Sequence, residues 1–133
     1  MKIVLDANIF ISSFFWGGNQ KEIVKRVITG IDELFITKEI LDEIENVIRK
    51  PKFHADDDMI SYFITSIEEI GNKVIPKKLL INGSRDKTDN KYIEYGITAN
   101  VEYIISGDIH LLELKKYENI KIVNAKNYLD IVR

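Results

Sequence analysis

Two aspartates follow apolar runs of the sequence in a pattern that could place their carboxylates side by side. Asp6 comes directly after Ile3-Val4-Leu5, and Asp108 closes the segment Tyr103-Ile104-Ile105-Ser106-Gly107-Asp108. Short apolar runs of this kind are typical of strands that are buried on both faces. Because ligands bind at the carboxyl ends of the strands in parallel α/β sheets, neighbouring strands would bring both carboxylates to one edge. Either aspartate by itself could instead be a helix N-cap, since a helix is expected after both.

Two further acids, Glu43 and Asp89, are selected by helical phase. Glu43 lies in a helix expected over about residues 38–49, at the margin of its apolar stripe. Asp89 opens a helix expected over residues 89–99, on the inward face of that helix. By itself Glu43 is typical of a surface residue, and Asp89 of a first-turn acid favoured by the helix dipole. Asp86 competes with Asp89 as the third acid of such a group, and its position on the inward helical face favours Asp89.

Four carboxylates brought together would predict a divalent metal site. Magnesium and manganese prefer hard oxygen ligands, often one or two carboxylates together with waters and substrate phosphate oxygens. Carboxylates that are packed together without a cation repel one another. A bound divalent ion removes that repulsion, activates a water and neutralises charge on phosphoryl oxygens. The acids therefore predict metal-assisted hydrolysis of a phosphodiester, a reaction that needs no protein nucleophile.

The elements that must position these acids alternate between strands and helices. Apolar runs predict five strands, and amphipathic segments of helical length separate them. Right-handed crossovers between such strands give a mostly parallel sheet that is covered by helices on both faces. The Gly17-Gly18 pair divides the first helical region in two. The expected strands cover residues 3–5, 34–36, 73–75, 103–105 and 120–123, and the expected helices cover about residues 9–15, 20–28, 38–49, 56–70, 89–99 and 125–131.

The composition excludes several classes of protein. The chain has 133 residues, 45% of them hydrophobic and 30% charged, as in ordinary globular proteins. It has no cysteine for a disulfide framework or thiolate metal site, and no apolar run approaches the ~20 residues of a membrane span. No repeat or linker divides it, so we expect a single domain over residues 1–133, in the cytoplasm and with no membrane partner. With a net charge of −2, any phosphate binding must be local or metal-assisted.

Five short motifs around these acids resemble those of the PIN-domain nucleases, and in particular the VapC-like toxin components of toxin–antitoxin systems. The resemblance extends over the full chain, with the motifs in order and at a family-like spacing. Ala7 stands where the family commonly has Thr, Thr88 where it has an acid or proline, and Ser106 where it has Thr, but no acid is missing. The motifs are residues 3–12 (IVLDANIFIS), 37–44 (TKEILDEI), 49–53 (RKPKF), 85–91 (RDKTDNK) and 103–108 (YIISGD).

The resemblance implies a three-layer α/β/α sandwich around a mostly parallel five-stranded sheet. It also implies an endoribonuclease that cuts single-stranded RNA with Mg²⁺ or Mn²⁺. A toxin of this kind would be neutralised by a cognate antitoxin, and it could form a homodimer. By position, the catalytic acids and metal ligands would be Asp6, Glu43, Asp89 and Asp108. The residues that support these ligands would be Asn8, Ser12, Asn90 and Ser106.

Basic and aromatic residues suggest where RNA would lie. Three basic residues surround the third acid and could hold RNA phosphates, although such charges are also typical of a solvated face. They are Arg85, Lys87 and Lys91. Trp16 is interpreted as a partly buried loop aromatic, with stacking on a base as the alternative.

Other functions stay open beside the ribonuclease. A magnesium-dependent phosphatase also has an acid at the end of its first strand, but it needs a second aspartate two residues later, where this chain has Asn8. A non-catalytic PIN-like module would use the acids only for structure or for docking RNA or protein. His54 and His110 are isolated and give no zinc motif. One helical stripe is interpreted as core, with part of it available to a homodimer or an antitoxin: Met59, Tyr62, Phe63 and Ile67.

Overall fold

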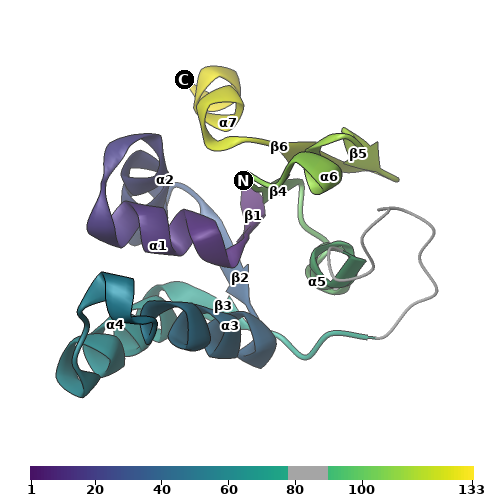
Figure 1. The fold of residues 1–133 in the computed structure, drawn as a ribbon. Coiled ribbons are helices and arrows are strands. Elements are labelled where there is room, and N and C mark those ends of the chain that lie inside the picture. Colours follow the sequence, from purple (N-terminus) through teal and green to yellow (C-terminus); the bar gives the residue numbers. More distant parts are fainter. Residues whose placement is uncertain (78–89) are drawn as a thin grey trace.

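The computed structural model describes residues 1–77 and 90–133, with side chains from residue 91 onward in the second range. Within these residues the strands form a six-stranded sheet in the order β3-β2-β1-β4-β6-β5 (Figure 1). Neighbouring strands run parallel, except that β5 is antiparallel to β6. The strands are β1 (Lys2–Leu5), β2 (Glu33–Ile36), β3 (Gly71–Lys73), β4 (Tyr103–Ile105), β5 (Lys116–Tyr117) and β6 (Ile120–Val123).

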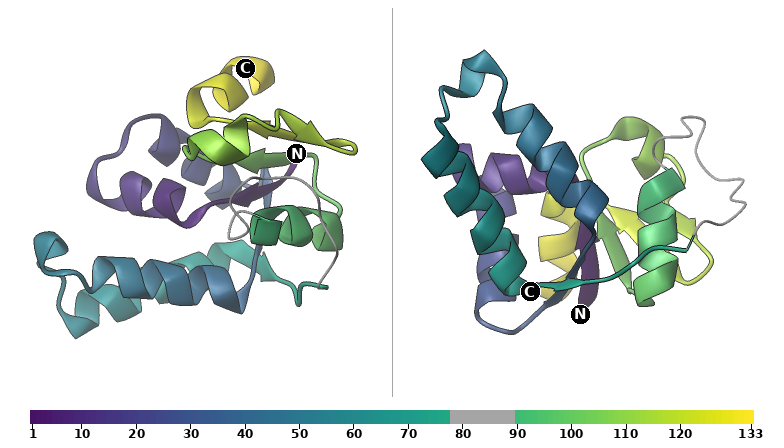
Figure 2. Two further views of the ribbon diagram at one scale, coloured as in Figure 1. Left: turned by 45° about the vertical axis from the view of Figure 1, so that its right-hand side comes forward. Right: turned by 90° about the horizontal axis from the view of Figure 1, so that it is seen from below.

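Helices cover both faces of the sheet, which confirms the predicted three-layer α/β/α architecture (Figures 1 and 2). On one face lie α1, α2 and α7, and on the other α5 packs against β1, β2 and β4. At the β3 edge, α3 and α4 run side by side. The helices are α1 (Ala7–Phe15), α2 (Gly18–Ile28), α3 (Lys38–Ile48), η1 (a 3₁₀ turn, Pro51–Phe53), α4 (Asp57–Ile70), α5 (Asn90–Ala99), α6 (Ile109–Leu112) and α7 (Ala125–Val132).

The sheet differs from the predicted one at both edges. The third strand covers Gly71–Lys73 rather than residues 73–75, and the two-residue β5 adds a sixth strand. β3 has the sequence Gly-Asn-Lys, which contains no apolar run, and none of its residues is buried. β5 belongs to a tight hairpin in which Lys115 and Glu118 have φ angles of 62° and 51°. Edge strands as short as these carry too little periodicity for sequence patterns to detect.

Local side-chain chemistry explains where the helices begin. Thr37 Oγ1 accepts the Ile40 N–H at 3.1 Å at the start of α3, and an Asp56 carboxylate oxygen accepts the Met59 N–H at 2.8 Å at the start of α4. Between α1 and α2, Gly17 has a φ of 79°, in the left-handed region that glycine adopts without steric cost. The two caps fix where α3 and α4 begin, and the glycine separates α1 from α2.

β1 and β4 form the buried centre of the sheet and bring two segments together. Leu5 and Ile105 are fully buried and are partners in the parallel register. On the adjoining helix α5, a Cβ at Gly96 would lie 3.1 Å from the Ile104 side chain, so the helix and strand are in close contact. α5 is therefore packed tightly against β4 and also contacts β1.

The apolar stripe of α4 is only half core. Phe63 and Ile67 are buried, but Tyr62 is 68% exposed and Met59 39% exposed, so the core interpretation is wrong for these two residues. The reason is that α4 packs on α3 and β3 at the border of the molecule, which leaves its outer side to solvent. Among the helices of the described residues, none is long and apolar enough to cross a membrane.

Candidate active site

Asp6 and Ser106 leave the sheet side by side, where β1 and β4 end. Because Leu5 pairs with Ile105, the residues that follow them are adjacent, and the Asp6 N–H donates to the Ile105 carbonyl at 3.1 Å. This is the carboxyl edge of the parallel strands, where the sites of such sheets form. The two strands that precede the predicted acids are thus neighbours, as a shared site requires.

The Ser106 hydroxyl links the two aspartates. It is fully buried, it donates to Asp6 Oδ2, and it accepts the Asp108 N–H at 3.0 Å. Asp6 Oδ2 also accepts the Gly107 N–H at 3.3 Å. A hydroxyl can donate and accept at once, so a serine here fixes the position of one aspartate relative to the other.

Both aspartates also cap helices. Asp6 Oδ1 accepts the Ile9 N–H at 3.0 Å, and Asp108 Oδ1 accepts the His110 N–H at 2.8 Å. The N-cap interpretation is therefore confirmed for both residues. An aspartate that caps a helix can still belong to the site, because each cap uses only one of the two carboxylate oxygens. In the part of the chain that the structure describes, Asp108 Oδ2 has no hydrogen-bond partner.

Glu43 reaches the same site from α3 and is held by two residues of α5. Lys91 Nζ donates to Oε1 at 2.9 Å, and the Tyr92 hydroxyl donates to Oε2 at 2.6 Å. The Tyr92 oxygen also accepts the Ala7 N–H at 3.2 Å, which ties Glu43 to the residue after Asp6. Burial, and after it the hydrogen bond to Glu43, raises the pKa of Tyr92, so its hydroxyl stays protonated as a donor.

Asp6, Glu43 and Asp108 line one pocket of about 520 Å³. Residues of α1, α3, η1 and α5 form its walls together with the segment that leads into α6. Three lysines stand around the acids, so the pocket combines carboxylates with positive charge. The lining residues are Asp6, Ala7, Asn8, Glu43, Val47, Lys50, Lys52, Lys91, Tyr92, Ser106, Asp108 and Leu111.

Asp6 is the most deeply buried acid of this pocket. It is only 4% exposed, and burial raises its pKa. Hydrogen bonds from Ser106, Ile9 and Gly107 lower the pKa, but they do not cancel the rise, to which the charge of Glu43 adds. Ionisation of Asp6 therefore costs more in the protein alone than it does in water, and a cation placed beside the carboxylate would offset this cost.

The remaining predicted residues lie at different distances from the pocket. Asn8 is exposed and lines it, whereas Ser12, one turn further along α1, is not among the lining residues. Asn90 is the first residue of α5, and its side chain is outside the described set. Three predicted residues lie outside the described residues altogether: Arg85, Lys87 and Asp89.

Three polar residues of the pocket were not predicted to belong to the site, although two of them, Lys50 and Lys52, lie in the motif of residues 49–53. Tyr92 is buried and holds Glu43, but its position one residue after Lys91 gave it no motif of its own. Lys50 and Lys52 flank Pro51 directly after the helix that carries Glu43. The signal that could have identified them is this pair of lysines beside a helix-ending proline, close to a predicted acid.

The oxygen donors of the pocket have the chemistry that Mg²⁺ and Mn²⁺ require. Asp6, Glu43 and Asp108 supply carboxylates, and a cation would offset the mutual repulsion of Asp6 and Glu43. Among residues 1–77 and 90–133, however, no three Asp, Glu, His or Cys side chains lie close enough to enclose a metal ion. Further oxygens, from water or from a substrate phosphate, would have to complete the coordination.

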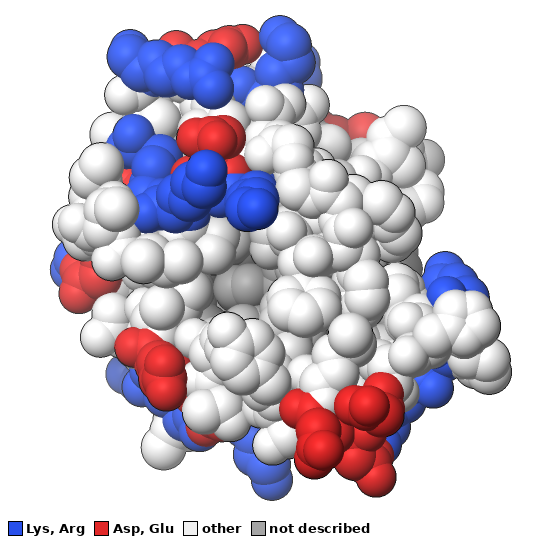
Figure 3. All heavy atoms as spheres, turned by 90° about the vertical axis from the view of Figure 1, so that its left-hand side faces the viewer, with Lys and Arg blue, Asp and Glu red and all other residues white. Residues whose placement is uncertain are grey.

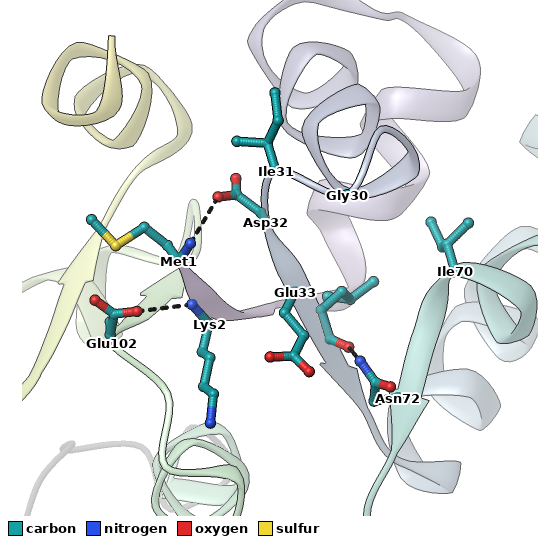
Figure 4. Close-up of a pocket in the computed structure, with 10 residues that line it drawn as sticks. Met1, Lys2, Gly30, Ile31, Asp32, Glu33, Ile70, Asn72 and Glu102 are labelled. Atoms are coloured by element: carbon teal, nitrogen blue, oxygen red, sulfur yellow. Dashed lines mark hydrogen bonds and ion pairs between the residues drawn. The ribbon is translucent and has the colours of Figure 1, made fainter.

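A second pocket, of about 440 Å³, opens at the opposite, amino-terminal edge of the sheet (Figure 4). Several of its polar groups already have protein partners. The Met1 amino group lies 3.3 Å from Asp32 Oδ1, and the Lys2 N–H donates to Glu102 at 3.0 Å (Figure 4). Arg26 Nε contacts the other oxygen of Asp32 at 2.8 Å. We therefore assign this cluster to stability, since ligands of such sheets bind at the other edge.

Comparisons with known proteins identify the family. No curated protein matches the chain. The family described as PIN domain matches residues 2–110, from the first residue of β1 to two residues beyond Asp108. This range includes every acid of the candidate site. The chain therefore belongs to the PIN-domain family, whose members are generally metal-dependent nucleases.

Proposed function

We propose that this protein is a divalent-metal-dependent endoribonuclease that cuts single-stranded RNA. The observation that carries the proposal is the linkage of Asp6 to Asp108 through Ser106, with Glu43 in the same pocket. Asp6, Glu43 and Asp108, together with Asp89 as the sequence predicts, would hold Mg²⁺ or Mn²⁺. Bound there, the ion would supply an activated water and neutralise charge on the phosphoryl oxygens.

The residues around these acids would orient them and balance their charge. Ser106 sets the position of Asp6 relative to Asp108, and Tyr92 sets the position of Glu43. Lys91 neutralises Glu43, and a substrate phosphate would be a second partner for its ammonium group. Lys50 and Lys52 add the local positive charge that a net charge of −2 does not provide over the whole chain.

The test is cleavage of single-stranded RNA by the purified protein with Mg²⁺ or Mn²⁺. Asp6→Asn and Glu43→Gln should each lower kcat/KM by about 10³-fold or more, because both carboxylates belong to the proposed metal site. Asp42→Asn is the matched control, since Asp42 is the exposed neighbour of Glu43 on α3 and lies outside the pocket. Cleavage that persists in excess chelator, or in Asp6→Asn, would contradict the metal mechanism.

Three parallel assays separate the alternatives and test the choice of substrate. Phosphate release from small esters, without RNA cleavage, would favour the phosphatase, although the residue two positions after Asp6 is Asn8. RNA binding without cleavage in any divalent metal would favour a non-catalytic module. Single-stranded DNA of the same sequence shows whether the activity is specific for RNA.

We further propose that the protein acts in the cytoplasm as the toxin of a toxin–antitoxin pair. Support comes from an apolar groove of about 490 Å³ between α2 and α4, over α1. Phe14, Ile28 and Tyr62 line the groove and are exposed, and contiguous exposed apolar surface commonly marks a protein interface. Figure 3 shows the corresponding face as a broad uncharged band between clusters of charged side chains. Its proposed occupant is the apolar side of an antitoxin helix.

Co-expression tests the toxin role separately from catalysis. The protein alone should arrest growth of its host, and a small protein encoded beside it should restore growth. Tyr62→Glu should prevent the rescue and leave RNA cleavage unchanged, because Tyr62 lies in the groove and not in the acidic pocket. An active enzyme that does not arrest growth would contradict the toxin role alone. If the protein instead forms a homodimer through this groove, analytical ultracentrifugation should show a dimer for the wild type and a monomer for Tyr62→Glu.

A further inference from the structure

Trp16 lies in the open at the end of α1, contrary to its interpretation as a partly buried aromatic. Its side chain is 71% exposed. It belongs to a group of three neighbouring rings, which we call the aromatic platform: Phe15, Trp16 and Phe53. The Trp16 ring centroid lies 5.9 Å from that of Phe15 and 6.2 Å from that of Phe53, and the two phenylalanine rings are 4.9 Å apart. The two half-buried phenylalanines thus support a tryptophan that faces solvent.

Lys52 connects the aromatic platform to the acidic pocket. Lys52 Nζ lies 5.1 Å from the centre of the Phe53 ring, and Lys52 also lines the pocket together with Lys50. α1 provides a second connection, because Asp6 caps its first turn and Trp16 follows its last residue. The nine residues of α1 span ~14 Å at 1.5 Å per residue. The platform therefore stands at one end of a path that begins at the acids and passes the lysines.

This combination suits a single-stranded nucleic acid. Such strands are bound by positive charge that follows the backbone and by aromatic rings on which bases stack. Lys50 and Lys52 supply the charge, and Trp16 supplies a free ring face. At the ~3.4 Å per nucleotide of a strand in a stacked duplex, ~14 Å corresponds to at most about four nucleotides, and an extended single strand covers this length with fewer.

We propose that Trp16 stacks a base of a single-stranded nucleic acid whose phosphates lie along Lys50 and Lys52, a few nucleotides from the acidic pocket. The proposal rests on the proposed nuclease function and adds a binding site for the substrate. It makes Trp16 a positioning residue, which acts on affinity for longer strands and not on the reacting bond. A protein partner is less well supported here, because the residues of the apolar groove do not include Trp16 and the platform is bordered by lysine.

Trp16 is the only tryptophan of the chain, so its fluorescence reports directly on this site. Unlabelled single-stranded RNA should be titrated into the wild-type protein in chelator, where metal-dependent cleavage is absent. Fluorescence should change saturably with a strand of six or more nucleotides and not with a dinucleotide at the same concentration. Trp16→Ala should bind the longer strand about tenfold more weakly, measured by anisotropy of a labelled strand, and Trp16→Phe should recover part of the affinity.

The matched control is Tyr62→Ala, since Tyr62 is about equally exposed but lies in the apolar groove. It should bind RNA as the wild type does. In cleavage assays with metal, Trp16→Ala should raise KM for the longer strand about tenfold, with kcat unchanged and with dinucleotide cleavage unaffected. Thermal melting of Trp16→Ala should match that of the wild type, because the ring is exposed.

The outcomes separate this proposal from the nuclease function. A saturable response at Trp16 in a protein that cleaves no RNA would support the binding site and overturn the nuclease. If the wild type and Trp16→Ala both cleave RNA and bind the longer strand with equal affinity, the binding site alone is overturned. Self-association that depends on Trp16, with no response to RNA, would overturn it in favour of a protein interface.

Discussion

Asp6 and Asp32 are two buried aspartates at opposite ends of the same sheet, and the protein shifts their pKa values in opposite directions. Asp32, at the amino end, lies against Arg26 at 2.8 Å and the Met1 amino group at 3.3 Å. Burial by itself raises the pKa of Asp32, but hydrogen bonds and positive charge together outweigh burial, with the hydrogen bond from Arg26 as the largest of these effects, and the pKa lies below its ordinary value. The cation that this carboxylate needs is therefore built into the chain.

At the carboxyl end, the donors to Asp6 are neutral. They are the Ser106 hydroxyl and two backbone N–H groups, and they leave the pKa of Asp6 above its ordinary value because burial dominates. The same residue type thus contributes to stability where a protein cation is fixed beside it. Where such a cation is missing, the protein bears a cost that a ligand can remove, as is common at functional sites.

The largest effect on stability is expected from breaking the amino-end cluster. Asp32→Asn should lower the free energy of unfolding by ~2–4 kcal/mol, because it removes the charge from a buried ion pair in which Arg26 keeps some contact with solvent. Urea denaturation followed by circular dichroism measures this change. Asp6→Asn in chelator should be neutral or stabilising, since it removes a disfavoured buried charge while an amide oxygen can still cap α1. Equal losses in both variants would contradict the contrast between the two ends.

Divalent metal should distinguish the same two residues. At 100 times its Kd, a ligand that binds only the folded state stabilises it by ~2.7 kcal/mol. Mg²⁺ or Mn²⁺ should therefore raise the melting temperature of the wild type and, by a similar increment, that of Asp32→Asn. Asp6→Asn should show little increase in differential scanning fluorimetry. A full shift in Asp6→Asn would mean that the metal binds elsewhere.

The smallest effect concerns pH. Asp32, with its lowered pKa, contributes stability that is complete above an ordinary pKa of about 3.9 and is lost as the pH falls below it. Asp6, with its raised pKa, has the opposite sign: metal-free stability falls as the pH rises from about 3.9 through the folded-state pKa. Unfolding free energies of the wild type and both variants from pH 3 to 7 should show each trend disappear with its own residue. If stability depends on pH in the same way in all three proteins, the opposite pH dependences assigned to Asp32 and Asp6 are wrong.

The sequence could predict those parts of the site that depend on local pattern. The apolar runs before Asp6 and Asp108 place both residues at strand ends, and helical phase places Glu43 at the edge of a buried stripe, where its side chain is 35% exposed. The partners of Glu43 could not be predicted, because Lys91 and Tyr92 come from 48 and 49 residues further along the chain. Periodicity within one helix contains no information about the helix that packs beside it.

Exposure on the surface was the least predictable property. Trp16 and Tyr62 are both aromatic residues beside apolar neighbours, and burial is the usual outcome for such patterns. Their exposure depends on which elements happen to pack nearby. The edge strand β3 lies two residues before its predicted position of 73–75. Its position is set by pairing with β2 and not by an apolar run of its own.

Direct measurement of Mn²⁺ binding tests the central claim, that the acids at the carboxyl edge form a metal site. Free Mn²⁺ can be followed by electron paramagnetic resonance during titration of the wild type, Asp6→Asn and the exposed-residue control Asp42→Asn. We predict saturable binding by the wild type and by Asp42→Asn, and at least ~10-fold weaker binding by Asp6→Asn. Equal affinity in all three proteins, or no binding by the wild type even with single-stranded RNA present, would contradict the claim.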